Sequence, residues 1–183
     1  MKYRIKISQI VTLLLLAIAK PYCWDLFAAG MALGALGEAL RLWSAGNLYK
    51  DKKLATCGPY KMTRNPLYLG SFIMALGFSV ACINPAYPVR TTALILAVLL
   101  GFKFVYRMQV EAEEIHLKNL FAADYEQYCA AVPRYLPKLG AWGEALSSNR
   151  FTIRQANYNR EYQTVLGFLC VALFVAVKLH MGL

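Results

Sequence analysis

An uncharged run covers residues 66–83 and follows directly after the basic residue Arg64. Its 18 residues are roughly the length that an α-helix needs to cross the hydrocarbon core of a bilayer. The dipeptide Asn65-Pro66 precedes the run, and proline suits the first turn of a helix. The sequence therefore predicts a membrane helix that begins at Pro66, with Arg64 at the membrane surface.

Four other apolar runs have a similar character, and together they predict an all-α, polytopic membrane helix bundle. The chain is 58% hydrophobic and only 16% charged, whereas soluble domains are about a quarter charged. We expect about five transmembrane helices in one domain that covers residues 1–183. The predicted spans are residues 7–19, 23–43, 66–83, 91–106 and 162–177.

The basic residues predict how these spans are oriented. With a cytoplasmic N-terminus, 16 of the 20 lysine and arginine residues fall on the cytoplasmic side, as the positive-inside rule requires. Lys20, Arg90 and Lys178 are then the basic residues near the outer face. We expect the first span to be a signal anchor rather than a cleaved signal. The net charge of +10 indicates contact with membrane lipids rather than nucleic acid, because the basic residues lie beside apolar spans.

Helical periodicity continues from the fourth predicted span toward Pro133 without a glycine or proline after Gly101. One long helix should therefore leave the bilayer and extend into the cytoplasm. Lys103, Arg107, Glu111 and Glu114 recur at helical spacing and predict one charged stripe along it. Ion pairs four residues apart on a solvated face would explain the outer part of this stripe equally well.

Small and charged residues in the second span suggest helix packing. Gly30 and Gly34 form a GxxxG step, which lets a neighbouring helix approach closely. Glu38 and Arg41 are three residues apart and could pair on one helical face. The five cysteines lack the spacing of a disulfide framework or a zinc site, so we expect no metal.

Two motifs carry a family resemblance. They are GPYKMTRNPLYLG at 58–70 and EAEEIHLKNLFAADYEQYCAAVPRYLP at 111–137, with Asn84-Pro85 between them. In order, spacing and membrane context, residues 41–137 resemble the integral-membrane methyltransferases that include isoprenylcysteine carboxyl methyltransferase and the phospholipid methyltransferases.

This resemblance implies an S-adenosyl-L-methionine pocket on the cytoplasmic side, formed by loops and the extension of the fourth helix. It also implies a lipophilic methyl acceptor that arrives from the bilayer. The residues that it assigns to the cofactor are Lys53, Leu54, Ala55, Tyr60, Asn65, Pro66, Leu67, Tyr68, Glu113 and Glu114. The eukaryotic carboxyl methyltransferases have a motif that resembles RHPxY, and Asn65 stands where that motif has histidine. Asparagine cannot titrate near neutral pH as histidine does.

Arg107 and Arg64 are the candidate catalytic residues. A fixed guanidinium can hold a carboxylate at two points, and we expect Arg107 to hold an acceptor carboxylate. Such an acceptor needs no general base, whereas an amine or thiol would need one, such as His116. A prenylated cysteine, an aminophospholipid and a small lipophilic acid or thiol remain possible acceptors. The same architecture also resembles nicotinamide-dependent membrane reductases, and a non-catalytic membrane subunit is the third alternative.

Overall fold

A computed structural model describes residues 17–182, and this part of the chain contains helices and turns without any strand. The elements are α2 (Trp24–Gly46), η1 (Gly58–Lys61), α3 (Pro66–Ala81), α4 (Pro88–Gly101), η2 (Phe102–Tyr106), α5 (Arg107–Ala131), η3 (Leu139–Ala141), α6 (Trp142–Ser147), α7 (Ile153–Tyr158) and α8 (Tyr162–Met181). The predicted all-α class is confirmed.

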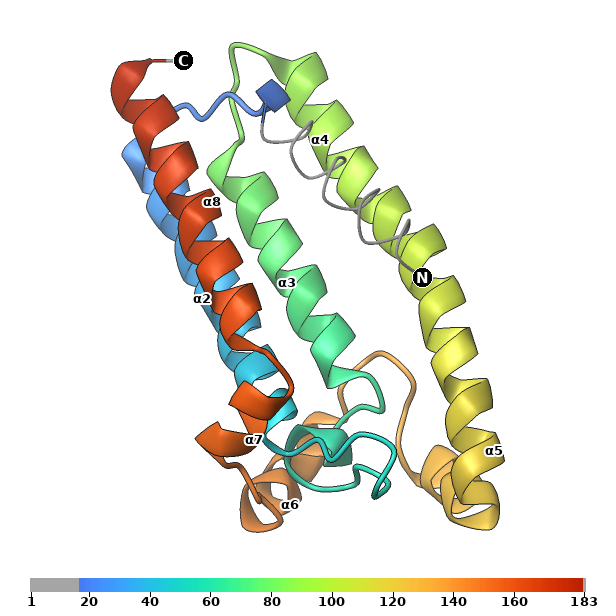
Figure 1. The fold of residues 1–183 in the computed structure, drawn as a ribbon. Helices are drawn as coiled ribbons and strands as arrows, with labels where there is room; N and C mark the ends of the chain where they lie inside the picture. The colour runs from blue at the N-terminus through green and yellow to red at the C-terminus, as the bar shows by residue number, and fades with distance from the viewer. Residues whose placement is uncertain (1–16, 183) are drawn as a thin grey trace.

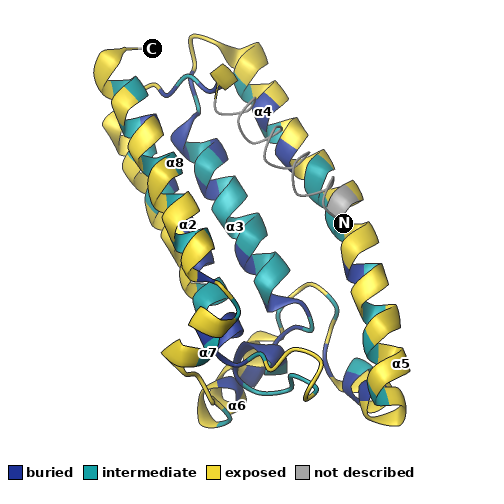
Figure 2. Cartoon of the chain, in the orientation of Figure 1, coloured by how far each residue is buried: buried dark blue, intermediate teal, exposed yellow. Residues whose placement is uncertain are grey.

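The long helices form three columns (Figure 1). Helices α2 and α8 lie side by side, α3 occupies the middle, and α4, η2 and α5 follow one another as one long rod. The short elements η1, α6 and α7 gather at the end of the bundle where α3 begins. Figure 2 shows α3 as largely buried or intermediate, whereas α4 and α8 expose much of their surface. The loops that follow α2 and α5 therefore meet at the first turn of α3.

Three of the described helices are long and apolar enough to cross a membrane: α2, the helix from Pro88 to Ala131, and α8. The third predicted span corresponds to α3, an apolar helix of 16 residues that is shorter than this criterion. The first predicted span, 7–19, lies almost wholly outside the described residues. The helices support an integral membrane protein, and the orientation stays a prediction.

The long helix that the sequence predicted after the fourth span is confirmed, with two irregularities. Its helical rod covers 44 residues, and η2 is a π-helical turn inside it. A π turn departs from regular α-helical geometry, yet Lys103 and Arg107 still line the same groove. The rod is kinked at Ala122, whose φ is 42°. Arg107 and Glu111 do form the expected pair, with Nε and Oε1 2.9 Å apart.

Glycines bring α2 and α3 into close contact. A Cβ atom on Gly77 would lie 2.5 Å from the Gly30 oxygen and from the Gly34 nitrogen. A Cβ atom on Gly37 would lie 2.6 Å from the Gly70 oxygen. Since real Cβ atoms do not approach backbone atoms this closely, any larger residue must push the helices apart. The GxxxG prediction is therefore confirmed, and the partner is α3.

We expect Gly77→Ala to destabilise the bundle by about 1–3 kcal/mol, the usual cost of overpacking. The measurement is the thermal unfolding midpoint of purified protein in detergent. Gly167→Ala in α8 is the control, because a Cβ atom there meets nothing within 4 Å. If both substitutions lower the midpoint equally, the close contact between α2 and α3 does not carry this stability.

Candidate functional site

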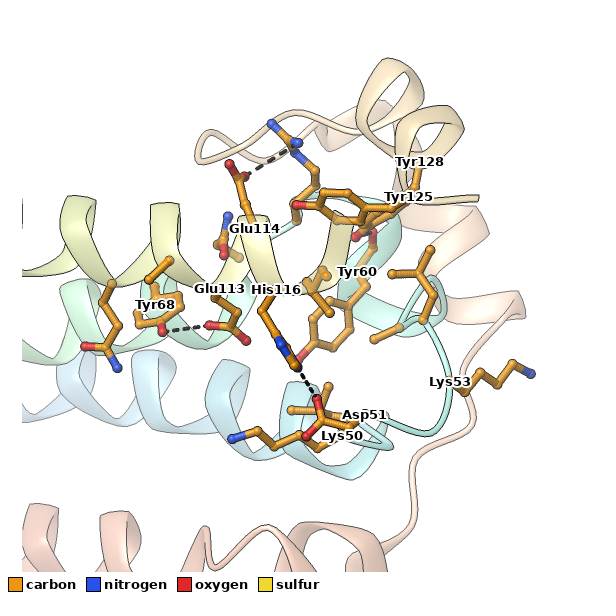
Figure 3. A pocket seen from close by; sticks show the side chains of 18 residues that line it. Lys50, Asp51, Lys53, Tyr60, Tyr68, Glu113, Glu114, His116, Tyr125 and Tyr128 are labelled. Carbon is orange, nitrogen blue, oxygen red and sulfur yellow. Dashed lines mark hydrogen bonds and ion pairs between the residues drawn. The ribbon is translucent and has the colours of Figure 1, made fainter. Parts of the chain in front are cut away.

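A cavity of about 440 Å³ lies among the loop after α2, η1, the first turn of α3 and the helix α5. We call it the polar cavity (Figure 3). Tyrosines and a carboxylate face one another across it, because α3 and the α5 extension approach each other at this end of the bundle. It therefore offers both aromatic faces and a negative charge.

Tyr68 and Glu113 join α3 to α5 inside the polar cavity. The Tyr68 hydroxyl donates to Glu113 Oε2 at 2.8 Å (Figure 3). The Tyr68 ring also meets Tyr106 edge to face, with the ring centroids 5.2 Å apart. These two contacts hold the Glu113 carboxylate at the cavity wall. A cationic ligand in the cavity would meet it there.

His116 and Asp51 connect the loop after α2 to the helix α5. His116 Nε2 lies 2.9 Å from Asp51 Oδ1, and both side chains are more than half exposed. Asp51 has a φ of 58°, a left-handed conformation that asparagine and aspartate tolerate better than most residues. This pair fastens the loop after α2 to α5 along one side of the polar cavity.

Glu114 binds two arginines at the other side of the polar cavity. Its Oε1 lies 3.5 Å from Arg64 Nη1, and its Oε2 lies 2.6 Å from Arg134 Nη2. Burial alone would lower the pKa of Arg64, but Glu114, Cys129 and Tyr125 together outweigh this effect and the pKa is raised. Arg64 also donates its backbone N–H to the Pro133 carbonyl at 2.9 Å. Glu114 therefore connects α5 to the loop before α3, which carries Arg64, and to the loop after α5, which carries Arg134.

Tyr60 lies buried at the base of the cavity. Its carbonyl accepts a hydrogen bond from the Tyr128 hydroxyl at 2.8 Å. Burial, and after it the charge of Glu113, raise the pKa of Tyr60 well above its ordinary value. The Tyr60 hydroxyl therefore stays protonated and can donate a hydrogen bond to a ligand.

Three further spaces lie near the polar cavity, and two of them share residues with it. The side chamber, about 380 Å³, shares Tyr68 and Glu113 with it. The apolar cavity, about 480 Å³, lies among α2, α3, α4 and α8 and meets the side chamber at Arg41. The cationic groove, about 440 Å³, lies between α3 and η2 and carries Lys103 and Arg107. Apolar space thus approaches Tyr68 from two directions.

The pair that the sequence suggested between Glu38 and Arg41 is not formed. Arg41 Nε instead donates to Glu161 Oε1 at 2.7 Å. Both Glu38 carboxylate oxygens are buried without a hydrogen-bond partner among the described residues. The correction has a topological cause, because α8 begins beside α2 and brings Glu161 to the guanidinium from a distant part of the sequence.

Comparison with known proteins places this geometry in a family. The model of a family described as phospholipid methyltransferase matches residues 26–124. The chain belongs to the phospholipid methyltransferase family. Those residues contain α3, η2 and the first two thirds of α5, and so most of the polar cavity. The family resemblance of the sequence is confirmed, and it supports methyltransferase activity in an integral membrane protein.

Curated relatives of this chain carry two kinds of name. The nickel-cobalt-cadmium resistance protein NccN of Alcaligenes xylosoxydans xylosoxydans is 29% identical over 97% of the chain and 84% of its own length. The probable protein-S-isoprenylcysteine O-methyltransferase of Oryza sativa subsp. indica is 30% identical over 62% of each chain. Protein-S-isoprenylcysteine O-methyltransferase of Rattus norvegicus is 32% identical over 64% of this chain and 43% of its own. No solved structure gives a significant match.

The chain therefore spans about half of the length of the named methyltransferases and most of the length of NccN. Although NccN is named for resistance to metals, residues 17–182 contain no group of three or more histidine, cysteine, aspartate or glutamate residues that could hold a metal ion. All of the predicted site residues fall within the residues that the family model matches.

Most of the predicted site residues lie together. Nine of them line the polar cavity: Lys53, Leu54, Ala55, Tyr60, Arg64, Asn65, Tyr68, Glu113 and Glu114. Glu113 and Glu114 differ in their surroundings, since Glu113 contacts Tyr68 whereas Glu114 binds two arginines. Lys53 lies at the rim and its side chain points away (Figure 3). Their roles toward a cofactor stay predictions.

Three predicted residues lie outside the polar cavity. Pro66 is fully buried at the start of α3, and Leu67 lines the side chamber. The Arg107 side chain is 71% exposed and lies on the cationic groove. Its pKa is raised by the hydrogen bond that it donates to Glu111 and by the charge of that carboxylate. A role for Arg107 toward an acceptor stays a prediction.

Several residues that line the polar cavity have no role in the prediction from the sequence. They include Lys50, Asp51, Gln109, Tyr125 and Tyr128. Tyr125 and Tyr128 are three residues apart, and Gln109 is four residues from Glu113, and both spacings place residues on one helical face. From the sequence alone, the spacing of the two tyrosines indicates that they share a helical face. Lys50 and Asp51 belong to an irregular loop, whose position no periodicity predicts.

Asn65 has a structural contact in place of a titratable group. Its Nδ2 donates to the Arg134 carbonyl at 3.0 Å, and the nearby Thr63 hydroxyl donates to the same carbonyl at 3.3 Å. The amide therefore helps to fasten the loop after α5 to the start of α3. Histidine could offer such a donor too, but asparagine keeps it at every pH.

We expect Glu114→Gln to destabilise the protein by about 3 kcal/mol, because it leaves two largely buried arginines without their carboxylate. The thermal unfolding midpoint in detergent measures this effect. Glu111→Gln is the matched control on the same helix, and the exposed pair that it removes should be worth less than about 1 kcal/mol. Equal losses for the two variants would contradict a special role for Glu114.

Proposed function

We propose that this protein transfers a methyl group from S-adenosyl-L-methionine to the carboxylate of a lipophilic acceptor. The donor occupies the polar cavity, and the acceptor arrives from the bilayer. The observation that carries the proposal is the Glu113 carboxylate, which contacts Tyr68 within a wall of tyrosines. A sulfonium cation is attracted both by carboxylates and by aromatic faces.

The cavity suits the other parts of the donor as well. Its volume of about 440 Å³ falls within the usual range for small-molecule sites. The amino acid head of the donor calls for paired charges, and Glu113 and Arg64 have opposite charges. The flat adenine calls for an apolar slot, and Leu54 packs with the buried tyrosines Tyr125 and Tyr128. These features support a donor site without any dinucleotide-binding fold.

The carboxylate acceptor follows from chemistry and from the relatives. Several are named isoprenylcysteine O-methyltransferases, and an O-methyl product requires an oxygen nucleophile. S-adenosyl-L-methionine, when bound, supplies an electrophilic methyl group. A carboxylate oxygen can take this group directly and releases no proton. The protein then contributes orientation and a dry setting, which can supply much of the rate in such reactions.

The acceptor reaches the donor from the membrane side in this proposal. Both the apolar cavity and the cationic groove lead toward Tyr68. Lys103 and Arg107 on the groove could attract an acid, which agrees with the role that the sequence suggested for Arg107. The lysine and arginine distribution supports a cytoplasmic donor side.

In a calorimetric titration, we expect the purified protein to bind S-adenosyl-L-methionine and not to bind NADPH. Glu113→Gln should weaken donor binding by about 1.5–3 kcal/mol, because a charge-assisted contact becomes neutral. Glu126→Gln, an exposed position on the same helix, should leave binding unchanged. Binding of NADPH alone would favour a reductase, and binding of neither would favour a non-catalytic subunit.

The pH dependence of methyl transfer distinguishes the acceptor classes. A carboxyl group with an ordinary pKa near 3.5 is ionised at neutral pH, so the rate with a carboxylate acceptor should be flat from about pH 6 to 9. An amine or thiol must first lose a proton. A rate that rises about tenfold per pH unit through neutrality would therefore identify a phospholipid N-methyltransferase or a thiol methyltransferase instead.

A further inference from the structure

Arg41 is the charged residue where the apolar cavity meets the side chamber. Its side chain lines both spaces, and it is 17% exposed. The side chamber in turn shares Tyr68 and Glu113 with the polar cavity. A lipophilic molecule that entered from the apolar cavity would therefore meet Arg41 just before it reached the donor.

The Arg41 guanidinium is held rigidly by three helices. Its Nη1 donates to the Leu67 carbonyl at 3.3 Å and to the Ser71 hydroxyl, both on α3. Its Nη2 donates to the Thr164 hydroxyl of α8 at 3.3 Å. A guanidinium that is fixed in this way loses little conformational freedom when it binds a ligand. Its remaining edge, at Nε, faces a carboxylate.

That carboxylate belongs to Glu161, the residue just before α8. Glu161 Oε1 lies 2.7 Å from Arg41 Nε, and its side chain is only 6% exposed. Because Glu161 also lines the side chamber together with Lys50 and Asn159, it has other polar partners toward which it could turn. A carboxylate from this chain thus occupies the place where an acceptor carboxylate would bind.

The charge balance of the side chamber leaves room for one more carboxylate once the donor is bound. Arg41 and Lys50 balance Glu113 and Glu161 among the residues that line it. The proposed donor has a sulfonium, an ammonium and a carboxylate, and so brings a net positive charge. An acceptor carboxylate would offset it. Glu38 interacts electrostatically with Arg41 and Glu161, but it does not line the chamber.

We propose that Arg41 binds the carboxylate of the methyl acceptor, and that Glu161 holds this position until the acceptor displaces it. This inference rests on the proposed function and names the residue that recognises the acceptor. Arg107 is less suited, because its side chain is mostly exposed and already pairs with Glu111. Arg41 would select acids over neutral lipids and would turn the acid toward Tyr68 and the donor.

The test compares the binding of two probes to purified protein in detergent. The probes are S-farnesyl-N-acetylcysteine, which has a free carboxylate, and its carboxamide, and the readout is the ratio of their affinities. We expect the wild type to prefer the acid. Arg41→Lys keeps the charge but loses two-point binding, and should reduce the preference about tenfold. Glu161→Gln removes the competing carboxylate, and should increase the preference severalfold.

A purely structural ion pair would give a different result. Loss of either partner would then lower stability, while the ratio of the acid and amide affinities stayed the same. Arg154→Gln in α7 is the control for loss of an arginine, because this side chain is exposed and lines none of these spaces.

Two outcomes would overturn the assignment: no preference for the acid in the wild type, or a preference that Arg41→Lys leaves intact. Titration with S-adenosyl-L-methionine separates this inference from the proposed function. A protein that selects acids through Arg41 but does not bind the donor would refute methyl transfer and keep the acid site.

Discussion

The close contact between α2 and α3 is the constraint on which the rest of the structure depends. Gly30, Gly37, Gly70 and Gly77 let the two backbones touch, and within a membrane such contact is a main source of helix association. It also sets the height of α3 relative to α2. The first turn of α3, with Tyr68, consequently lies beside the end of α2, from which the loop of the polar cavity departs.

Two clusters of charged residues join the helices and loops around the site, where the glycine contact between α2 and α3 does not reach. Glu114 fastens the helix α5 to Arg64 and Arg134, which lie on loops before α3 and after α5. Arg41 fastens α2 to α3 and α8. Both clusters lie at the same end of the bundle, on opposite sides of Tyr68. Removing one partner of such a sheltered pair leaves an uncompensated charge, so these pairs matter more to this end of the bundle than surface pairs do.

Because of this arrangement, the two adjacent glutamates have different partners. Glu114 is occupied by two arginines, whereas Glu113 faces a tyrosine hydroxyl and the cavity. Neighbouring residues on a helix point about 100° apart, so they meet different surroundings. Among the carboxylates that line the polar cavity, Glu113 is the one without a cationic partner in the described ion pairs, and a methyl donor would meet it there. Position, more than proton transfer, is what such a site can contribute.

The sequence by itself determined three of the predicted membrane helices, the long extension of the fourth helix and the family, because apolar run length, helical period and motif spacing are local properties. It also named nine of the residues that line the polar cavity. Apart from the local pair of Arg107 and Glu111, only the tertiary structure decided the partners of the charged residues. Arg41 pairs with Glu161, which is 120 residues away, rather than with Glu38 on its own helix. Local periodicity can place a charge on a helical face, but the packing of distant helices determines which opposite charge lies within reach.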